Sequence, residues 1–343
     1  MGATSAAPAL PPFEPGPLEA YLRRELPDLD GAMIVEPIAG GQSNPTFFLR
    51  FDDMALVLRK QPPGELLPSA HAVDREHRIM TALAATDVPV PRTLLYSDDR
   101  DIVGTPFYVM EAVPGRVFHD SALPGVAPAE RSAMYDSMND VLARLHRVDW
   151  QAIGLGEFGK PGNYFLRQIG RWTRQWQSSK TREIPEIDRL IDWLPANVPD
   201  DDETTICHGD FRLGNLMFHP QEPRVVAVLD WELSTLGHPL ADLAFVCMLY
   251  HTTPAEYGGV QGLDLAALGI PSEDAFVGSY CARVGRDEGI GPFHLAFSMF
   301  RFAVILEGIS ARAQAGSAAA ENAEAVGALS RVFAERACET IGD

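Results

Sequence analysis

The chain has 343 residues, of which 46% are hydrophobic, so it is long enough to form two hydrophobic cores. Its 47 acidic residues outnumber its 28 basic residues and give a net charge of -19, which argues against nucleic acid and anionic membranes as partners. The same charge would suit a cationic substrate, although acidic surfaces commonly serve solubility alone.

The cysteines, the N-terminal segment and the longest apolar stretch indicate the expected cellular location. The cysteines show neither zinc-ligand nor disulfide-framework spacing, which fits a reducing, cytoplasmic compartment. Residues 1–16 are rich in Ala and Pro without the features of a signal peptide, and we expect a mobile tail there. The longest apolar stretch, Pro292 to Ile309, is interrupted by His294, Arg301 and Glu307 and predicts a buried helix rather than a membrane span.

The segment from residue 17 to residue 113 is expected to form a first lobe built on a β-meander. Pro17 to Leu26 predicts a short helix that ends in turn-forming residues. Apolar runs separated by Gly-rich and Asp-Asp turns predict the first three strands. The complete set of strands expected in this lobe is Met33 to Ile38, Thr46 to Phe51, Met54 to Lys60, Leu94 to Tyr96 and Thr105 to Val113, with a helix over Ala72 to Ala84.

Residues 114–343 are expected to form a larger, mainly helical second lobe. Apolar residues recur at helical spacing through most of it. The predicted helices are Ala127 to Val148, Asn163 to Lys180, Glu186 to Leu194, Pro239 to His251, Ser272 to Gly285, Pro292 to Ala315 and Ser317 to Ile341.

A glycine-rich segment between the first two strands is a candidate phosphate-binding loop. In Gly40-Gly41-Gln42-Ser43-Asn44 the glycines would let main-chain N–H groups approach a triphosphate, and Ser43 or Asn44 would add a donor. The segment matches neither the Walker pattern nor G-x-G-x-x-G, and a plain Gly-Gly hairpin loop is the alternative interpretation.

Residues 206 to 232 carry the pattern most specific for chemistry. A strand-like run ends in His208-Gly209-Asp210, Asn215 follows five residues after the Asp, and a second strand-like run ends in Asp230. This layout suits phosphoryl transfer: Asp210 would accept the proton of an attacking hydroxyl, and Asn215 and Asp230 would hold Mg²⁺. The spacing equals that of the kinase catalytic loop H-R-D-x-x-x-x-N. We expect His208 to brace this loop rather than act as a base, and Arg212 is grouped with the catalytic residues.

These residues, with Asp230-Trp231-Glu232 and the segment from Gly237 to Ala244, resemble the aminoglycoside phosphotransferase family of kinase-like folds. The segments Gly40 to Thr46 and Leu58 to Gly64 resemble the branch of that family associated with acyl-CoA dehydrogenases. The resemblance covers roughly residues 30 to 310. It implies an α+β, bilobal, protein-kinase-like fold with a small N-terminal antiparallel β-sheet lobe and a larger helical C-terminal lobe.

The resemblance also implies a nucleotide site for ATP with Mg²⁺. Such a site needs a cation on the third strand and an acid on the next helix to hold it. Arg59 and Lys60 both qualify and should point to opposite faces, with the family pattern favouring Arg59; Glu76 is the expected acid. The strand that leads into the second lobe would meet the adenine with the backbone of Glu111 to Val113. Met110 is either a wall of that pocket or ordinary core.

The expected activity is therefore transfer of the γ-phosphoryl group of ATP to a hydroxyl of a small molecule. An aminoglycoside acceptor would require several acids in the second lobe. A hydroxy acid or hydroxyacyl-CoA would instead call for arginines, for which Arg171, Arg174, Arg283 and Arg286 are available. A nucleotide-binding module without activity, a protein kinase, and a metal-dependent hydrolase built on His208 and Asp210 are further alternatives. The sequence leaves the oligomeric state open.

Overall fold

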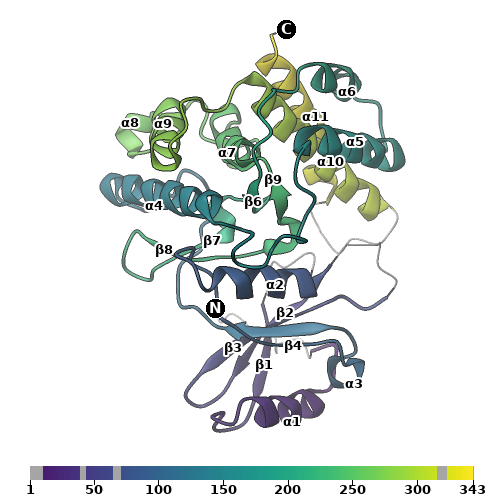
Figure 1. Cartoon of the computed structure of the whole chain (residues 1–343), viewed down its shortest axis with the longest axis vertical. Helices are drawn as coiled ribbons and strands as arrows, with labels where there is room; N and C mark the ends of the chain where they lie inside the picture. The colour runs from purple at the N-terminus through teal and green to yellow at the C-terminus, as the bar shows by residue number, and fades with distance from the viewer. Residues whose placement is uncertain (1–10, 39–43, 65–70, 315–322, 343) are drawn as a thin grey trace, which may run out of the picture. The chain divides into compact units, whose positions relative to one another are not determined.

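The computed structural model describes residues 11–38, 44–64, 71–314 and 323–342. The chain divides into two compact units. The first contains residues up to Ala85 together with Val90–Pro114, and the second contains Thr86–Pro89 together with Gly115–Asp343. Figure 1 labels the elements of both units.

The first unit is built on one antiparallel sheet with strand order β1-β2-β3-β5-β4. The first three strands follow one another as a meander, with Phe47 of β2 paired to Leu58 of β3, and β5 then pairs with β3. The strands are β1 (Ile34–Pro37), β2 (Thr46–Arg50), β3 (Ala55–Lys60), β4 (Thr93–Ser97) and β5 (Phe107–Glu111), and the helices are α1 (Pro15–Glu25), α2 (Val73–Leu83) and α3 (Arg100–Val103).

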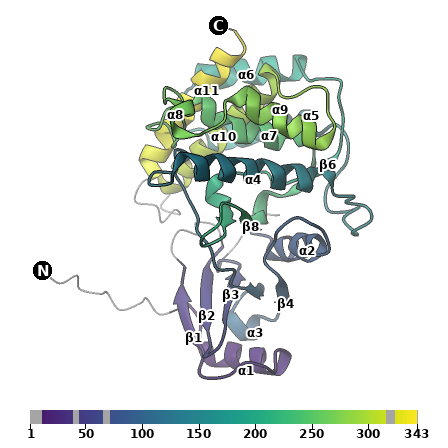
Figure 2. The ribbon, with the colours of Figure 1, turned by 90° about the vertical axis from the view of Figure 1, so that its left-hand side faces the viewer.

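One face of this sheet forms the apolar core of the unit. Leu18 and Leu22 of α1 pack in one cluster with alternate residues of β2, such as Phe47 and Leu49. Figure 2 shows α1 next to β1 and β2. This alternation is the period that puts every second strand residue on one face. Helix α1 begins two residues earlier than expected. In addition Phe13, inside the segment expected to be a tail, lies edge-on against Phe47 with ring centroids 5.3 Å apart.

The second unit is mainly helical and contains two short antiparallel strand pairs, β6 with β9 and β7 with β8. The sequence did not indicate β9, because three residues are too short for a periodic signal. The strands are β6 (Thr205–Cys207), β7 (Leu216–Phe218), β8 (Val225–Val228) and β9 (Thr235–Gly237). The helices are α4 (Pro128–Arg147), α5 (Tyr164–Ser179), α6 (Pro185–Ala196), α7 (Pro239–Cys247), α8 (Leu265–Leu268), α9 (Glu273–Val284), α10 (Pro292–Gln314) and α11 (Ala323–Thr340), with 3₁₀ turns η1 (Leu213–Asn215), η2 (Trp231–Leu233) and η3 (Met248–His251).

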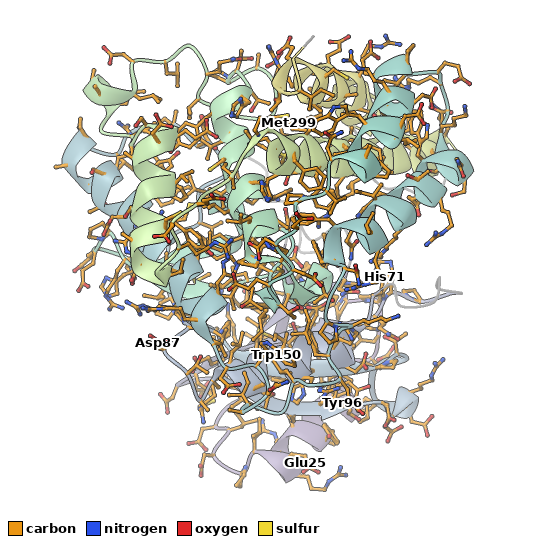
Figure 3. The ribbon with its side chains drawn as sticks, turned by 45° about the horizontal axis from the view of Figure 1, so that its top comes forward. Glu25, His71, Asp87, Tyr96, Trp150 and Met299 are labelled. Carbon is orange, nitrogen blue, oxygen red and sulfur yellow. The ribbon has the colours of Figure 1, made fainter. Side chains whose placement is uncertain are left out.

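Helix α10 is the centre of the second core, and it packs side by side with α11 (Figure 1). It is buried around most of its circumference, as an apolar helix in the middle of a large core must be. Met299, labelled in Figure 3, is fully buried in its middle. Among the described residues α10 alone is long and apolar enough to cross a membrane, and 89% of its most apolar window is buried inside the protein.

Candidate active site

The loop that follows β6 is held by one buried carboxylate. Oδ2 of Asp242 accepts the main-chain N–H of His208 at 2.6 Å, and its Oδ1 accepts that of Gly209 at 2.9 Å. Asp242 lies in the first turn of α7, where a negative charge is favourable. Gly209 has a φ of +84°, and a Cβ there would stand 2.6 Å from the main-chain oxygen of Leu233. The turn of the His-Gly-Asp segment therefore requires glycine at this position.

His208 uses both ring nitrogens inside the protein. Nε2 lies 2.9 Å from the main-chain oxygen of Leu229, and Nδ1 accepts the main-chain N–H of Asp210 at 3.2 Å. This network assigns the proton to Nε2. Because the residue is also fully buried, the ring is placed to brace the loop and not to take a proton from a substrate.

Asp210 and Asn215 are joined directly. The amide nitrogen of Asn215 donates to the carboxylate Oδ2 of Asp210 at 2.7 Å and to the main-chain oxygen of the same residue at 2.8 Å. The short turn η1 brings the two residues together across the four intervening positions. Since the amide nitrogen makes both bonds, the Oδ1 atom of Asn215 has no hydrogen-bond donor within the part of the chain that the structure describes.

Arg212 lies beside the carboxylate of Asp210, with its Nε 3.4 Å from the nearest carboxylate oxygen. Burial, the strongest single influence, acts to lower the pKa of Arg212, but the charge of Asp210 and its neighbours outweighs it and raises this pKa. The guanidinium therefore stays positively charged next to the candidate base.

Asp230 follows β8 and has a left-handed backbone, with φ and ψ both 63°. Non-glycine residues rarely adopt this conformation, and those that do cluster at functional sites. The preceding residue connects Asp230 to the rest of the loop: Leu229 donates its N–H to the main-chain oxygen of Asn215 at 2.8 Å and accepts from His208. Leu229, the residue before Asp230, is therefore hydrogen-bonded to both His208 and Asn215.

The brace Asp242 is part of a buried network with His146 and Tyr280. His146 Nε2 lies 3.5 Å from Asp242, and its Nδ1 lies 2.6 Å from the Tyr280 hydroxyl. Burial, the strongest influence, acts to raise the pKa of Asp242, but the hydrogen bond and charge of His146, the charge of His208 and the N–H of Gly209 together lower it. Asp242 is therefore held as a carboxylate that accepts from the loop.

In the first unit the structure separates the two candidate cations. Nε of Arg59 lies 2.8 Å from Oε2 of the buried Glu76, which also accepts from the Tyr108 hydroxyl at 3.0 Å and from the Asn44 amide at 2.6 Å. Lys60 points to the other face, where its ammonium donates to the main-chain oxygen of Val103 and lies 5.1 Å from the ring of Phe13. Burial lowers the pKa of Lys60.

Tyr108 was missed by sequence reasoning. It lies opposite Arg59 in the register of β3 and β5, so a correct strand pairing would have found it. Asn44 is fully buried, and its amide also contacts His71, labelled in Figure 3, at 3.1 Å. Its side chain thus supports Glu76, whereas the sequence suggested that it donates to phosphate.

The structure gives less detail for the other residues that were expected to contact the nucleotide. Gly40, Gly41, Gln42 and Ser43 lie outside the described residues. Met110, Glu111 and Val113 are each half-buried at or just after the end of β5. Within the described ranges no three His, Cys, Asp or Glu side chains form a metal-binding group. The ligands expected from the sequence, Asn215 and Asp230, would offer one amide oxygen and one carboxylate, a set that would suit Mg²⁺ because that ion usually keeps several waters and binds substrate phosphates.

A pocket in the second unit, with a cavity volume of about 60 Å³, includes Arg212 and Gly214 of the catalytic loop in its wall. Among the described residues the wall is mostly apolar and contains no carboxylate. Its polar members other than Arg212 are His119, Ser121, Thr252 and Tyr257, and its apolar members are Met138, Leu213, Phe245, Val246, Met248, Leu249 and Phe333.

Residues 34–275 match the model of the phosphotransferase enzyme family. The chain belongs to this family. The match confirms the resemblance seen in the sequence, and the family supports a kinase that acts on a small molecule. The match extends over both units and includes Arg59, Glu76, Asp210, Asn215 and Asp230.

Relatives and solved structures of the family agree with this assignment. The chain is 47% identical over 329 residues to mouse acyl-CoA dehydrogenase family member 10, and 45% identical over 320 residues to family member 11 of Rattus norvegicus. These matches cover 93% and 90% of this chain but only 30% and 41% of the relatives, so the chain spans less than half the length of either.

A candidate aminoglycoside phosphotransferase from Ralstonia eutropha has 50% identity and a TM-score of 0.86, with 96% of this chain and 98% of that chain covered. The aminoglycoside phosphotransferase APH(4)-Ia, at 13% identity and a TM-score of 0.65 over 96% of this chain and all of that one, shares the fold. The kinase-like α+β fold is confirmed: a five-stranded antiparallel sheet unit and a larger helical unit.

Proposed function

We propose that this member of the phosphotransferase family transfers the γ-phosphoryl group of ATP to a hydroxyl of a small molecule. The observation that carries the proposal is the pair Asp210 and Asn215. The amide nitrogen of Asn215 orients the carboxylate, and the amide oxygen stays available for a cation. Phosphoryl transfer depends mainly on such positioning and on charge stabilisation.

The roles of the second-unit residues follow from their partners. Asp210 would accept the proton of the acceptor hydroxyl, and its side chain is 21% exposed, so it can be reached. Asn215 Oδ1 and the Asp230 carboxylate would hold Mg²⁺. When bound, the ion would neutralise charge on the phosphate oxygens. His208 and Asp242 keep the loop in place and do not exchange protons with the substrate.

The roles of the first-unit residues are proposed on the same basis. Arg59 would meet the phosphates of ATP, because it is partly exposed and Glu76 fixes its direction. Lys60 is committed to Val103 on the opposite face of the strand, so it is not the phosphate-binding cation in this proposal. The segment Gly40 to Ser43 would cover the phosphates through its main-chain N–H groups.

The pocket beside Arg212 favours a hydroxy acid or hydroxyacyl thioester over an aminoglycoside. A polycationic aminoglycoside needs acids around it, and the described residues of this pocket wall include none. An acyl chain would bury apolar surface against Met138, Phe245 and Phe333, with Arg212 available to an anionic or carbonyl group. The acyl-CoA dehydrogenase names of the relatives agree with this class.

For a CoA acceptor the arginines expected from the sequence are not equally available. Arg283 is paired with Asp136, and Arg286 with Asp201 and Glu203, so both charges are already compensated. Arg171 has no carboxylate within ion-pairing distance among the described residues and stays exposed, with its guanidinium 5.2 Å from the ring of Trp172. Arg174 is likewise exposed, and no carboxylate lies within ion-pairing distance of it among the described residues. We therefore assign Arg171 and Arg174, before Arg283 and Arg286, to the anionic end of a CoA thioester.

The test is ADP release from Mg-ATP with two panels of acceptors, aminoglycosides and hydroxy acids with their CoA thioesters. We expect stimulation by the second panel only, with loss of turnover in Asp210→Ala and Asp230→Asn. Asp264→Asn, which removes an exposed carboxylate that caps α8, is the matched control and should behave as wild type. Near-normal turnover of Asp230→Asn would refute the metal assignment, and stimulation by aminoglycosides alone would refute the acceptor class.

A further inference from the structure

Arg301, in the middle of α10, is a buried guanidinium next to the catalytic loop. Arg301 is 5% exposed, and its Nη2 donates to the main-chain oxygen of Gly209. No carboxylate lies within ion-pairing distance of it in the part of the chain that the structure describes. Burying such a charge without an acidic partner is costly, so a stability role alone does not account for an arginine here.

Two aromatic rings fix the direction of this guanidinium. Its Cζ lies 5.7 Å from the ring centroid of Trp172 on α5 and 5.6 Å from that of Phe245 on α7. Contacts of this kind favour a cation on a ring, and Arg more often than Lys makes them. Three helices therefore converge on one side chain, which is aimed at one carbonyl of the loop.

The carbonyl that Arg301 contacts belongs to the peptide between Gly209 and Asp210. The N–H of the same peptide is bound by Nδ1 of His208 at 3.2 Å. The two preceding N–H groups, of His208 and Gly209, are bound by Asp242. Three consecutive peptides are thus held by side chains, and Arg301 and His208 hold the last one from its two ends. The orientation of that last peptide sets the direction in which the Asp210 side chain leaves the backbone.

We infer that Arg301 is a positioning residue, which locks the Gly209–Asp210 peptide so that the Asp210 carboxylate stays in register with Asn215. The effect of Arg301 on catalysis rests on the proposed function, whereas its effect on the order of the Gly209–Asp210 peptide does not. Arg301 also links the loop to α5 and α7 through Trp172 and Phe245. This role could not be predicted from the sequence, because Arg301 stands in an apolar stretch as one interruption among three.

The experiment compares Arg301→Met, Arg301→Lys and, as a matched control on the same helix, the exposed Arg312→Met. Hydrogen exchange is measured on peptides that contain His208 to Asp210 and on peptides from α4. In Arg301→Met we expect the loop amides to exchange about tenfold faster or more, with α4 unchanged, because local opening costs less once the carbonyl is released. Arg301→Lys should lie between, and Arg312→Met should match wild type.

Unchanged exchange of the loop in Arg301→Met would overturn the inference whatever the activity is. Where the wild type turns over Mg-ATP, kcat of Arg301→Met should fall about 10- to 100-fold while KM for ATP changes by less than about twofold, since a misplaced base slows the chemical step without weakening nucleotide binding. A normal kcat would also overturn it. If the wild type shows no turnover, the proposed function fails, and the exchange result alone decides the role of Arg301.

Discussion

The amide nitrogen of Asn215 lies 2.7 Å from the carboxylate of Asp210, and the same nitrogen lies 2.8 Å from the main-chain oxygen of Asp210. One side chain therefore fixes both the backbone and the carboxylate of the candidate base. The remaining atom of the amide, Oδ1, is the only part of Asn215 left for a cation. In the proposed mechanism, orientation of the base and metal binding would thus depend on the same residue.

We expect Asn215→Ala to lower kcat by about 100-fold, because both the orientation of Asp210 and one metal ligand are lost. The free energy of unfolding should fall by only about 2 kcal/mol, about 1 kcal/mol for each of the two lost hydrogen bonds. Asn197→Ala, at the exposed end of α6, is the control. Steady-state kinetics and urea unfolding check the two quantities. A loss of stability without a loss of kcat would show that Asn215 is structural.

We expect Glu76→Ala to lower the free energy of unfolding by about 3 kcal/mol, because it leaves the Arg59 charge in a buried site without its acid. The control is Glu36→Ala, which breaks the exposed pair with Arg50 and should cost less than about 1 kcal/mol. KM for ATP should rise in Glu76→Ala and in Arg59→Met and stay unchanged in Glu36→Ala. Equal losses of stability in Glu76→Ala and Glu36→Ala would show that the pair of Glu76 with Arg59 does not behave as a buried ion pair.

The depressed pKa of Asp242 predicts a pH-dependent stability. Since its carboxylate is favoured by the folded state, its contribution is present above the unfolded pKa, about 4, and is lost as pH falls through the lower folded pKa. Asp242→Asn should be much less stable than wild type at pH 7, and the two proteins should converge as pH falls below about 4. Thermal unfolding at several pH values checks this. A gap that stays constant down to pH 3 would argue against an ionised Asp242.

His294 predicts a second loss of stability with falling pH, at higher pH than that of Asp242. Burial, helped by the charges of His238 and Arg286 and opposed by Asp201, lowers the pKa of His294 from 6.5 to about 4. Its Nδ1 accepts from Gly291 at 3.0 Å, and Nε2 has no partner among the described residues. Because the unfolded chain binds this proton more tightly, wild type should lose up to about 3 kcal/mol as pH falls from about 6.5 to 4. His294→Asn should remove most of that loss, whereas His219→Asn should keep it.

The sequence predicted those residues of the candidate site that lie a short, fixed number of positions apart. His208, Asp210, Asn215 and Asp230 could be found because strand ends and a short loop leave few ways to arrange them. The face of each residue in β3 also followed from strand alternation, which put Arg59 and Lys60 on opposite sides. Which of the two met Glu76 could not be decided, because the apolar run before them is buried on both faces of the sheet.

Two of the supporting residues, Tyr108 and Arg301, could not be predicted, because they come from distant positions in the chain. Tyr108 reaches Glu76 only through the pairing of β3 with β5, and Arg301 reaches Gly209 across 92 positions. Neither has a local pattern that marks it. The pocket beside Arg212 has the same origin, because its wall comes from residues between His119 and Phe333 that only the tertiary fold brings together.

The left-handed backbone of Asp230 has a consequence for directed evolution. Glycine adopts this conformation without the cost that a side chain adds, which is of order 1 kcal/mol. Asp230→Gly would remove this backbone cost, but it would also delete the proposed metal ligand and the other interactions of the Asp230 side chain. A library screened only for expression or melting temperature would not select for turnover at this position.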